Sequence, residues 1–102
     1  MTSEGLHEDK KDLRPETRNM HRALASLIEE LEAVAWYDQR ADACTDKELK
    51  KILQHNRDEE KEHAAMLLEW IRRQDPSFNT ELRDYMFSEK SITGAETEKK
   101  KE

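Results

Sequence analysis

The sequence predicts an all-α protein, built as an antiparallel hairpin of two long helices followed by a short C-terminal helix. Only 2 Gly and 2 Pro interrupt the 102 residues. A single Val and four Ile leave little material for strands, whereas the helix formers Ala, Leu, Glu, Lys and Arg are abundant. An all-β or doubly wound α/β domain is therefore excluded, and the length allows one domain at most.

The first long helix is expected from about Glu16 to Ala43, a stretch that contains no Gly or Pro. Its apolar residues recur at alternating spacings of four and three, as on one face of a helix. They are Met20, Leu24, Leu27, Leu31 and Val34. The polar residues 1–15 that precede this helix are expected to form a mobile N-terminal tail.

The second long helix is expected from Asp46 to about Arg73. Thr45 and Glu48 have the spacing of a capping box, in which each side chain accepts a hydrogen bond from the other's backbone N–H. Asp75-Pro76 then predicts the start of a short third helix, because Asp is a favoured cap and Pro a favoured first helical residue. Its apolar residues are Phe78, Leu82, Tyr85 and Met86. The helical domain would span residues 16–88, with a charged, mobile tail over 89–102.

Almost no residues join the two long helices, so they must turn back on each other as an antiparallel hairpin. Each helix has an apolar stripe wider than one partner can cover. A core this small rarely supplies more than about 3–5 kcal/mol of net stability. We therefore expect two hairpins to pair into a four-helix bundle.

The net charge of −6 argues against nucleic acid or an anionic membrane as a partner and favours cations, metal ions included. No apolar run of about 20 residues predicts a transmembrane helix, and the N-terminus is too polar for a secretory signal. The one cysteine, Cys44, has no partner for an internal disulfide. The sequence predicts a soluble, intracellular protein.

Polar residues interrupt the apolar face of the second helix. Glu60 and His63 lie about 60° apart on the face that also holds Leu67. An unpaired carboxylate that points inward costs several kcal/mol. Glu30, near the apolar face of the first helix, is a candidate partner. A Glu on one helix and a Glu-x-x-His on the other form half of a carboxylate-bridged di-metal site, and a second hairpin would supply the other half.

Four carboxylates and two imidazoles can neutralise two divalent cations, and this oxygen-rich set suits iron or manganese, although other divalent ions can substitute. Two simpler interpretations stay open: Glu60 and His63 form a buried hydrogen-bonded pair, or the helix register turns both toward solvent. His55, on the flank of the same helix, is a weak candidate for an accessory metal contact.

A second group of residues follows another stripe of the first helix. Glu29, Glu32 and Trp36 fall at i, i+3 and i+7. They indicate an acidic patch that gathers cations, an oligomer contact, or an ordinary solvated face. Tyr37 projects near Glu30, where it could donate a hydrogen bond to a ligating carboxylate or simply pack in an interface.

The segments EELEAVAWYDQRAD (29–42) and HNRDEEKEHAAMLLEWIRR (55–73) closely resemble the encapsulated ferritins, and the resemblance extends from about Met20 to Phe87. It implies a two-helix ferritin-like protomer that dimerises into a four-helix di-iron bundle, with the dimers arranged in a ring of ten subunits. It also implies a ferroxidase that oxidises Fe(II) with dioxygen, as iron-storing cargo inside an encapsulin nanocompartment.

The resemblance assigns roles by position. It implies that the di-iron ligands are Glu30, Glu60 and His63 from each of two subunits, with Trp36 and Tyr37 beside them and Glu29 and Glu32 drawing metal toward the centre. Two features depart from the family. Ala35 stands where an acid is expected, and the final residues ITGAETEKKKE show no clear shell-targeting peptide of the Gly-Ser-Leu-Arg kind.

Two other functions compete with the ferroxidase. The first is a non-enzymatic helical oligomerisation module with a structural metal site. The second is a peroxide-reducing di-iron protein of the rubrerythrin type, which is disfavoured because the chain lacks a Cys-rich electron-transfer domain.

Overall fold

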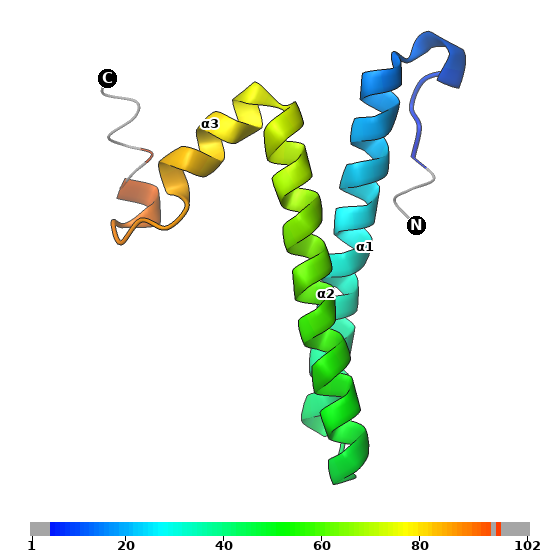
Figure 1. The fold of residues 1–102 in the computed structure, drawn as a ribbon, viewed down its shortest axis with the longest axis vertical. Helices are drawn as coiled ribbons and strands as arrows, with labels where there is room; N and C mark the ends of the chain where they lie inside the picture. The colour runs from blue at the N-terminus through cyan, green and yellow to red at the C-terminus, as the bar shows by residue number, and fades with distance from the viewer. Residues whose placement is uncertain (1–4, 95, 97–102) are drawn as a thin grey trace. The chain divides into compact units, whose positions relative to one another are not determined.

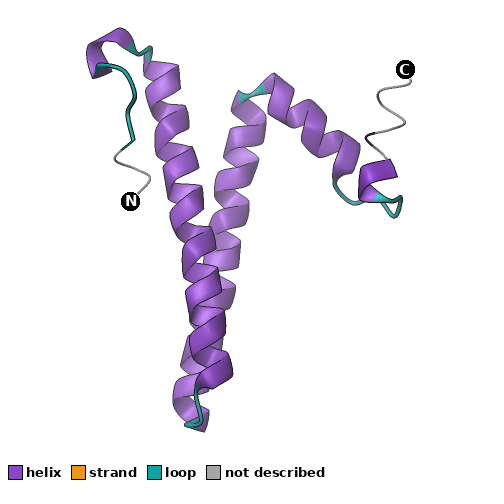
Figure 2. Cartoon of the chain, turned by 180° about the vertical axis from the view of Figure 1, so that it is seen from behind, coloured by secondary structure: helices purple, strands orange, loops and turns teal. Residues whose placement is uncertain are grey.

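The computed structural model describes residues 5–94 and 96 of the chain. These residues contain a short 3-10 helix, η2 (Lys10–Asp12), and the α-helices α1 (Pro15–Ala43), α2 (Lys47–Gln74) and α3 (Pro76–Tyr85) (Figure 1). None of the described residues lies in a strand (Figure 2). The predicted all-α class, with two long helices and a short third one, is confirmed. No helix in this part of the chain is both long and apolar enough to cross a membrane.

The predicted helix boundaries agree closely with the structure. α1 begins one residue earlier than expected, with Pro15 in the first position, where the missing N–H would have had no helical partner. The predicted tails remain predictions: the N-terminal one includes η2 among its described residues, and residues 1–4, 95 and 97–102 lie outside the description.

The predicted capping box at the start of α2 is wrong. The carboxylate of Asp46, rather than the hydroxyl of Thr45, accepts the free backbone N–H, with Leu49 N at 2.8 Å from Asp46 Oδ1. The Glu48 carboxylate does not reach back and lies 3.5 Å from Lys51 Nζ instead. The helix therefore starts one residue later, and an ionised cap favours its positive N-terminal end.

Because Asp46 and not Thr45 caps α2, two neighbouring substitutions should differ in their effect on stability. Asp46→Ala should lower the free energy of unfolding by about 1 kcal/mol, because it leaves a helix N–H without its partner. Thr45→Ala should change it by less than about 0.5 kcal/mol, as is usual for an exposed residue without such a role. Denaturant unfolding of both variants measures the difference. An equal loss of unfolding free energy in the two variants would support the capping box instead.

α3 begins as predicted. Asp75 Oδ1 accepts the backbone N–H of Phe78 at 3.0 Å, and Pro76 occupies the first helical position. Asn79 Oδ1 then accepts hydrogen bonds from Arg72 Nη1 at 2.6 Å and Arg83 Nε at 3.3 Å. These contacts belong to the C-terminal unit, residues 72–102, which is separate from the unit that ends at Ile71.

In the first unit, α1 and α2 run antiparallel side by side (Figures 1 and 2). Each helix presents one seam of residues spaced alternately four and three apart, with small or polar side chains at several positions. The α1 seam is Ala23, Leu27, Glu30, Val34, Tyr37 and Ala41; the α2 seam is Leu53, Arg57, Glu60, Ala64, Leu67 and Ile71. Ile71 is the one large side chain that is fully buried among the described residues. The hairpin core is accordingly small.

The apolar stripe predicted for α1 is split by this packing. Leu27 and Val34 lie on the seam, whereas Leu24 and Leu31 are exposed. Large apolar side chains on both long helices share this exposure. They are Leu24, Ile28, Leu31 and Trp36 on α1, and Leu49, Ile52, Met66 and Trp70 on α2. One hairpin therefore leaves much of its apolar surface uncovered.

Candidate metal centre

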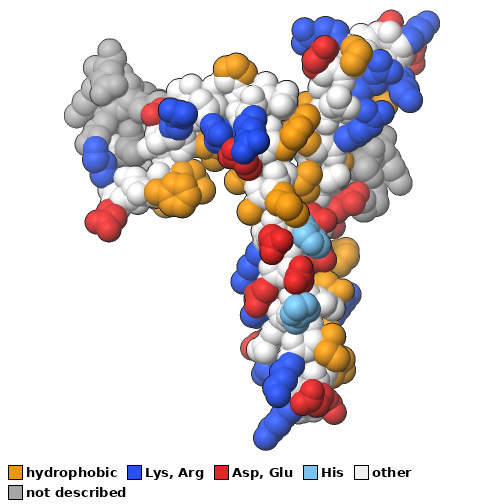
Figure 3. All heavy atoms as spheres, viewed as in Figure 1, with side chains coloured by type: hydrophobic (Ala, Val, Ile, Leu, Met, Phe, Trp, Pro, Cys, Tyr) orange, Lys and Arg blue, Asp and Glu red, His pale blue; other side chains and the backbone are white. Residues whose placement is uncertain are grey.

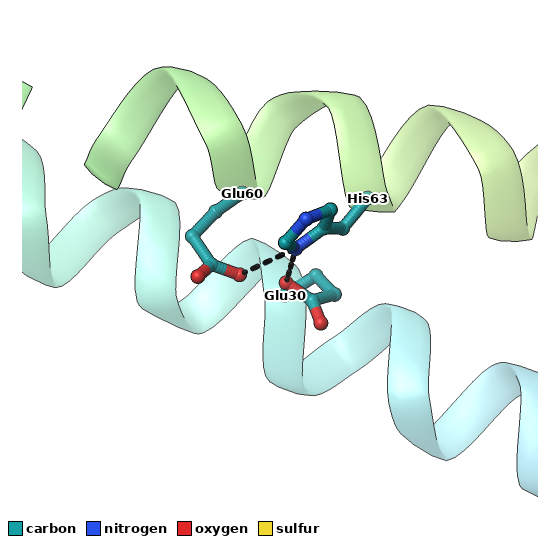
Figure 4. Close-up of side chains that lie close together, drawn as sticks. All are labelled: Glu30, Glu60 and His63. Atoms are coloured by element: carbon teal, nitrogen blue, oxygen red, sulfur yellow. Dashed lines mark ion pairs between the residues drawn. The ribbon is translucent and has the colours of Figure 1, made fainter. Parts of the chain in front are cut away.

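Three side chains from the two long helices converge at one point of the hairpin (Figure 4). Nδ1 of His63 lies 3.5 Å from Oε2 of Glu30 on α1 and 3.5 Å from Oε2 of Glu60, one turn away on α2. One nitrogen or oxygen atom from each residue falls within 4.8 Å of the others. The structure brings together the three residues predicted as metal ligands, and their role as ligands stays a prediction.

An ion pair between the helices lies one turn before Glu60. Arg57 on α2 reaches Asp38 on α1 at 2.9 Å and its neighbour Asp58 at 3.1 Å. The hydrogen bonds to Asp58 and Asp38 raise the pKa of Arg57, and the bond from Arg57 lowers the pKa of Asp58. Sequence reasoning did not find this link, because residues 19 apart in the chain give no local signal. It helps to hold the two helices in register at the converging side chains.

The three side chains have more acceptors than donors. His63 Nδ1 can donate at most one proton, yet two carboxylates face it. Oε2 of Glu30 is buried and forms no hydrogen bond with any described residue. The side chains of Glu30 and Glu60 are only 25% and 23% exposed, so water screens their charges incompletely. Such a set is stabilised by a cation placed among its oxygens.

The distances also fit a metal ion. Nitrogen and oxygen ligands lie about 2.0–2.2 Å from a first-row divalent ion such as zinc, so two ligands of one ion lie about 3–4 Å apart. Both separations from His63 Nδ1 fall within that range. Two carboxylates and an imidazole suit Fe, Mn or Zn. Among the described residues this group offers three ligands, fewer than the coordination positions of such an ion.

A fourth residue, Glu59, lies beside the converging group, near the second ring nitrogen of His63. Oε2 of Glu59 is 4.0 Å from His63 Nε2, and Oε1 of Glu59 is 3.5 Å from His55 Nε2. Acidic and histidine side chains follow each other along the α2 face in Figure 3. Sequence reasoning missed Glu59, although the i, i+4 spacing from His55 to Glu59 to His63 was a usable signal. His55 itself is largely exposed and outside the metal-capable group.

The other predicted residues lie on α1 around the centre. Glu29 and Trp36 are exposed and Glu32 is half-buried, and neither acid belongs to the metal-capable group of the described residues. Their predicted role in metal entry stays a prediction. The half-buried Tyr37 lies on the same seam as Glu30, with its ring centre 5.5 Å from the guanidinium carbon of Arg40. Its hydrogen bond to a ligating carboxylate also stays a prediction.

Comparison with known proteins identifies similar chains. A family model described as EncFtn-like matches residues 5–89. The "Encapsulated ferritin-like protein" of Rhodospirillum rubrum is 59% identical over 95 residues, which cover 93% of this chain and 68% of that protein. A "Ferritin-like protein" of Thermotoga maritima is 54% identical over 92 residues, covering 90% and 81%. The crystal structure of a Nitrosomonas europaea protein matches with a TM-score of 0.84 at 67% identity, covering 86% of this chain and 97% of that one.

Proposed function

This chain belongs to the EncFtn-like family, and on that premise we propose that it is a ferroxidase that oxidises Fe(II) to Fe(III) with dioxygen at a di-iron site shared by two subunits. One observation supports this most directly. Glu30, Glu60 and His63 converge from two helices, and a buried carboxylate oxygen among them has no hydrogen-bond partner in the described chain. The donor set therefore fits a divalent cation. Membership of the EncFtn-like family favours Fe(II) as that cation.

In the proposed reaction Fe(II) is the substrate. Each ion loses one electron, so two ions supply the two electrons that, with two protons, reduce one dioxygen to hydrogen peroxide. Glu30 and Glu60 neutralise the bound charge, and their anionic oxygens favour Fe(III) over Fe(II). Nδ1 of His63 would hold the ion between these two carboxylates. The chemistry requires no general base from the chain.

A second copy would complete the site. The side chain of His63 is 42% exposed, and helical geometry places Ile52 and Trp70 within about 20° of it around α2. Both are exposed, Ile52 to 56%. Packing a second hairpin against this face would cover these apolar side chains and bring two sets of ligands together. We propose that the pairs further assemble into a ring of ten subunits.

We also propose that the protein is cargo of an encapsulin shell in the cytoplasm. The Rhodospirillum rubrum relative is named as an encapsulated protein, and its similarity extends over 93% of this chain. Oxidation inside a closed shell would confine the insoluble Fe(III) product, so that the two proteins together store iron.

The first test is aerobic oxidation of Fe(II) by the purified protein, followed by the absorbance of Fe(III). We expect oxidation well above the rate in buffer, with a fast phase that saturates at two Fe(II) per pair of chains. Oxidation no faster than in buffer would favour the structural metal site. Rapid oxidation with hydrogen peroxide but not with dioxygen would favour a peroxide-reducing protein.

A further inference from the structure

Glu59 occupies a position that the proposed metal site does not use. The two ring nitrogens of His63 face different groups: Nδ1 faces Glu30 and Glu60, whereas Nε2 faces Glu59. If Nδ1 binds a metal ion, it must present its lone pair there, and the ring proton is then on Nε2. Nε2 lies 4.0 Å from Oε2 of Glu59, and a small rotation of either side chain would bring the two atoms to hydrogen-bond distance.

We propose that Glu59 is a positioning residue for His63, and that it accepts the Nε2–H when Nδ1 binds the metal ion. This inference rests on the proposed metal site. Metal-bound histidines commonly donate their second ring N–H to a carboxylate, which fixes the proton on that nitrogen and holds the ring in plane with the ion. Glu59 lies one helical turn before His63 on α2, so the helix itself sets the spacing.

The carboxylate of Glu59 is itself held from its other side. Its Oε1 faces His55 Nε2 at 3.5 Å, while its Oε2 faces His63. The Glu59 side chain is 48% exposed in the single chain, and Glu59 lies outside the group of side chains that could hold the ion. The contribution of Glu59 therefore comes mainly from orienting the His63 ring. An amide at this position, which still accepts a hydrogen bond, should retain part of it.

The experiment titrates the complete, assembled protein with Co(II), whose visible absorption reports ligand geometry. It compares the wild type with Glu59→Ala, Glu59→Gln and His63→Ala. Glu62→Gln is the matched control, because it removes the same charge from the same helix beside His63. We expect Glu59→Ala to weaken Co(II) binding by about 10-fold or more and to alter the spectrum. Glu59→Gln should lose less, and Glu62→Gln should resemble the wild type.

The outcomes separate this inference from the function on which it rests. Wild-type affinity and spectrum in Glu59→Ala would overturn the role of Glu59 while leaving the metal site intact. An equal loss in Glu62→Gln and Glu59→Gln would also overturn it, since the effect would then be one of general charge. If the wild type and His63→Ala bind Co(II) alike, the metal site itself fails, and the proposed function fails with it. Far-ultraviolet circular dichroism checks that each variant keeps its helices.

Discussion

His63→Ala is expected to reduce Fe(II) oxidation to about the rate in buffer while leaving the helical content unchanged. His63 supplies the one nitrogen among the three converging ligands, and its Nδ1 lies 3.5 Å from both carboxylates. Without it, each chain offers the ion only the carboxylates of Glu30 and Glu60. In a shared site the substitution removes two ligands at once, because each subunit contributes one.

The assay is the aerobic oxidation of Fe(II), with circular dichroism on the same samples. His7→Ala is the control, because it removes the same side chain from an exposed position outside the hairpin helices. The His63→Ala variant, purified without metal, should also gain no thermal stability when Fe(II) is added. The wild type should gain about 2.7 kcal/mol at a hundredfold excess of free ion over its dissociation constant. Unchanged oxidation kinetics in His63→Ala would remove this residue from the site.

The convergence of the three residues was predictable because it depends on simple geometry. Glu60 and His63 lie one turn apart on a single helix, which fixes their common face from sequence alone. Predicting that Glu30 joins them needed two further observations. The connection between the helices is too short for anything but a hairpin, and Glu30 lies near the apolar face of α1. Their distances to one another and the buried, unpaired oxygen of Glu30 came only from the structure, because they depend on how closely the helices approach.

The side of α1 that faces α2 was harder to predict. Two stripes spaced four and three apart overlap on this helix, and the more hydrophobic one contains Leu24 and Leu31, which are exposed in the single chain. The buried stripe contains Ala23 and Ala41 instead, whose side chains are small. A scale that ranks side chains by hydrophobicity places leucine above alanine. It therefore selects the stripe with Leu24 and Leu31, which a second hairpin could cover, and not the stripe that faces α2.

The second large expected effect concerns that uncovered surface. Ile52→Glu is expected to convert the assembled protein to a free chain of 12.1 kDa and, with it, to abolish Fe(II) oxidation. Ile52 is 56% exposed in the single chain and lies about three turns from His63 on the same side of α2. If a second hairpin covers this face, the new carboxylate would be buried without a partner wherever two hairpins pack together. Each such burial costs several kcal/mol.

Light scattering after size-exclusion chromatography measures the mass, and the oxidation assay runs on the same fractions. Lys51→Gln is the matched control, because it makes the same change in net charge at the adjacent residue, about 100° around the helix, and should leave both mass and activity unchanged. Loss of activity together with assembly would show that one chain holds too few ligands to oxidise iron. An Ile52→Glu variant that stays assembled would place the subunit contact on another face. A free chain that still oxidises Fe(II) rapidly would show that the three ligands of one hairpin suffice, and the shared site would have to be abandoned.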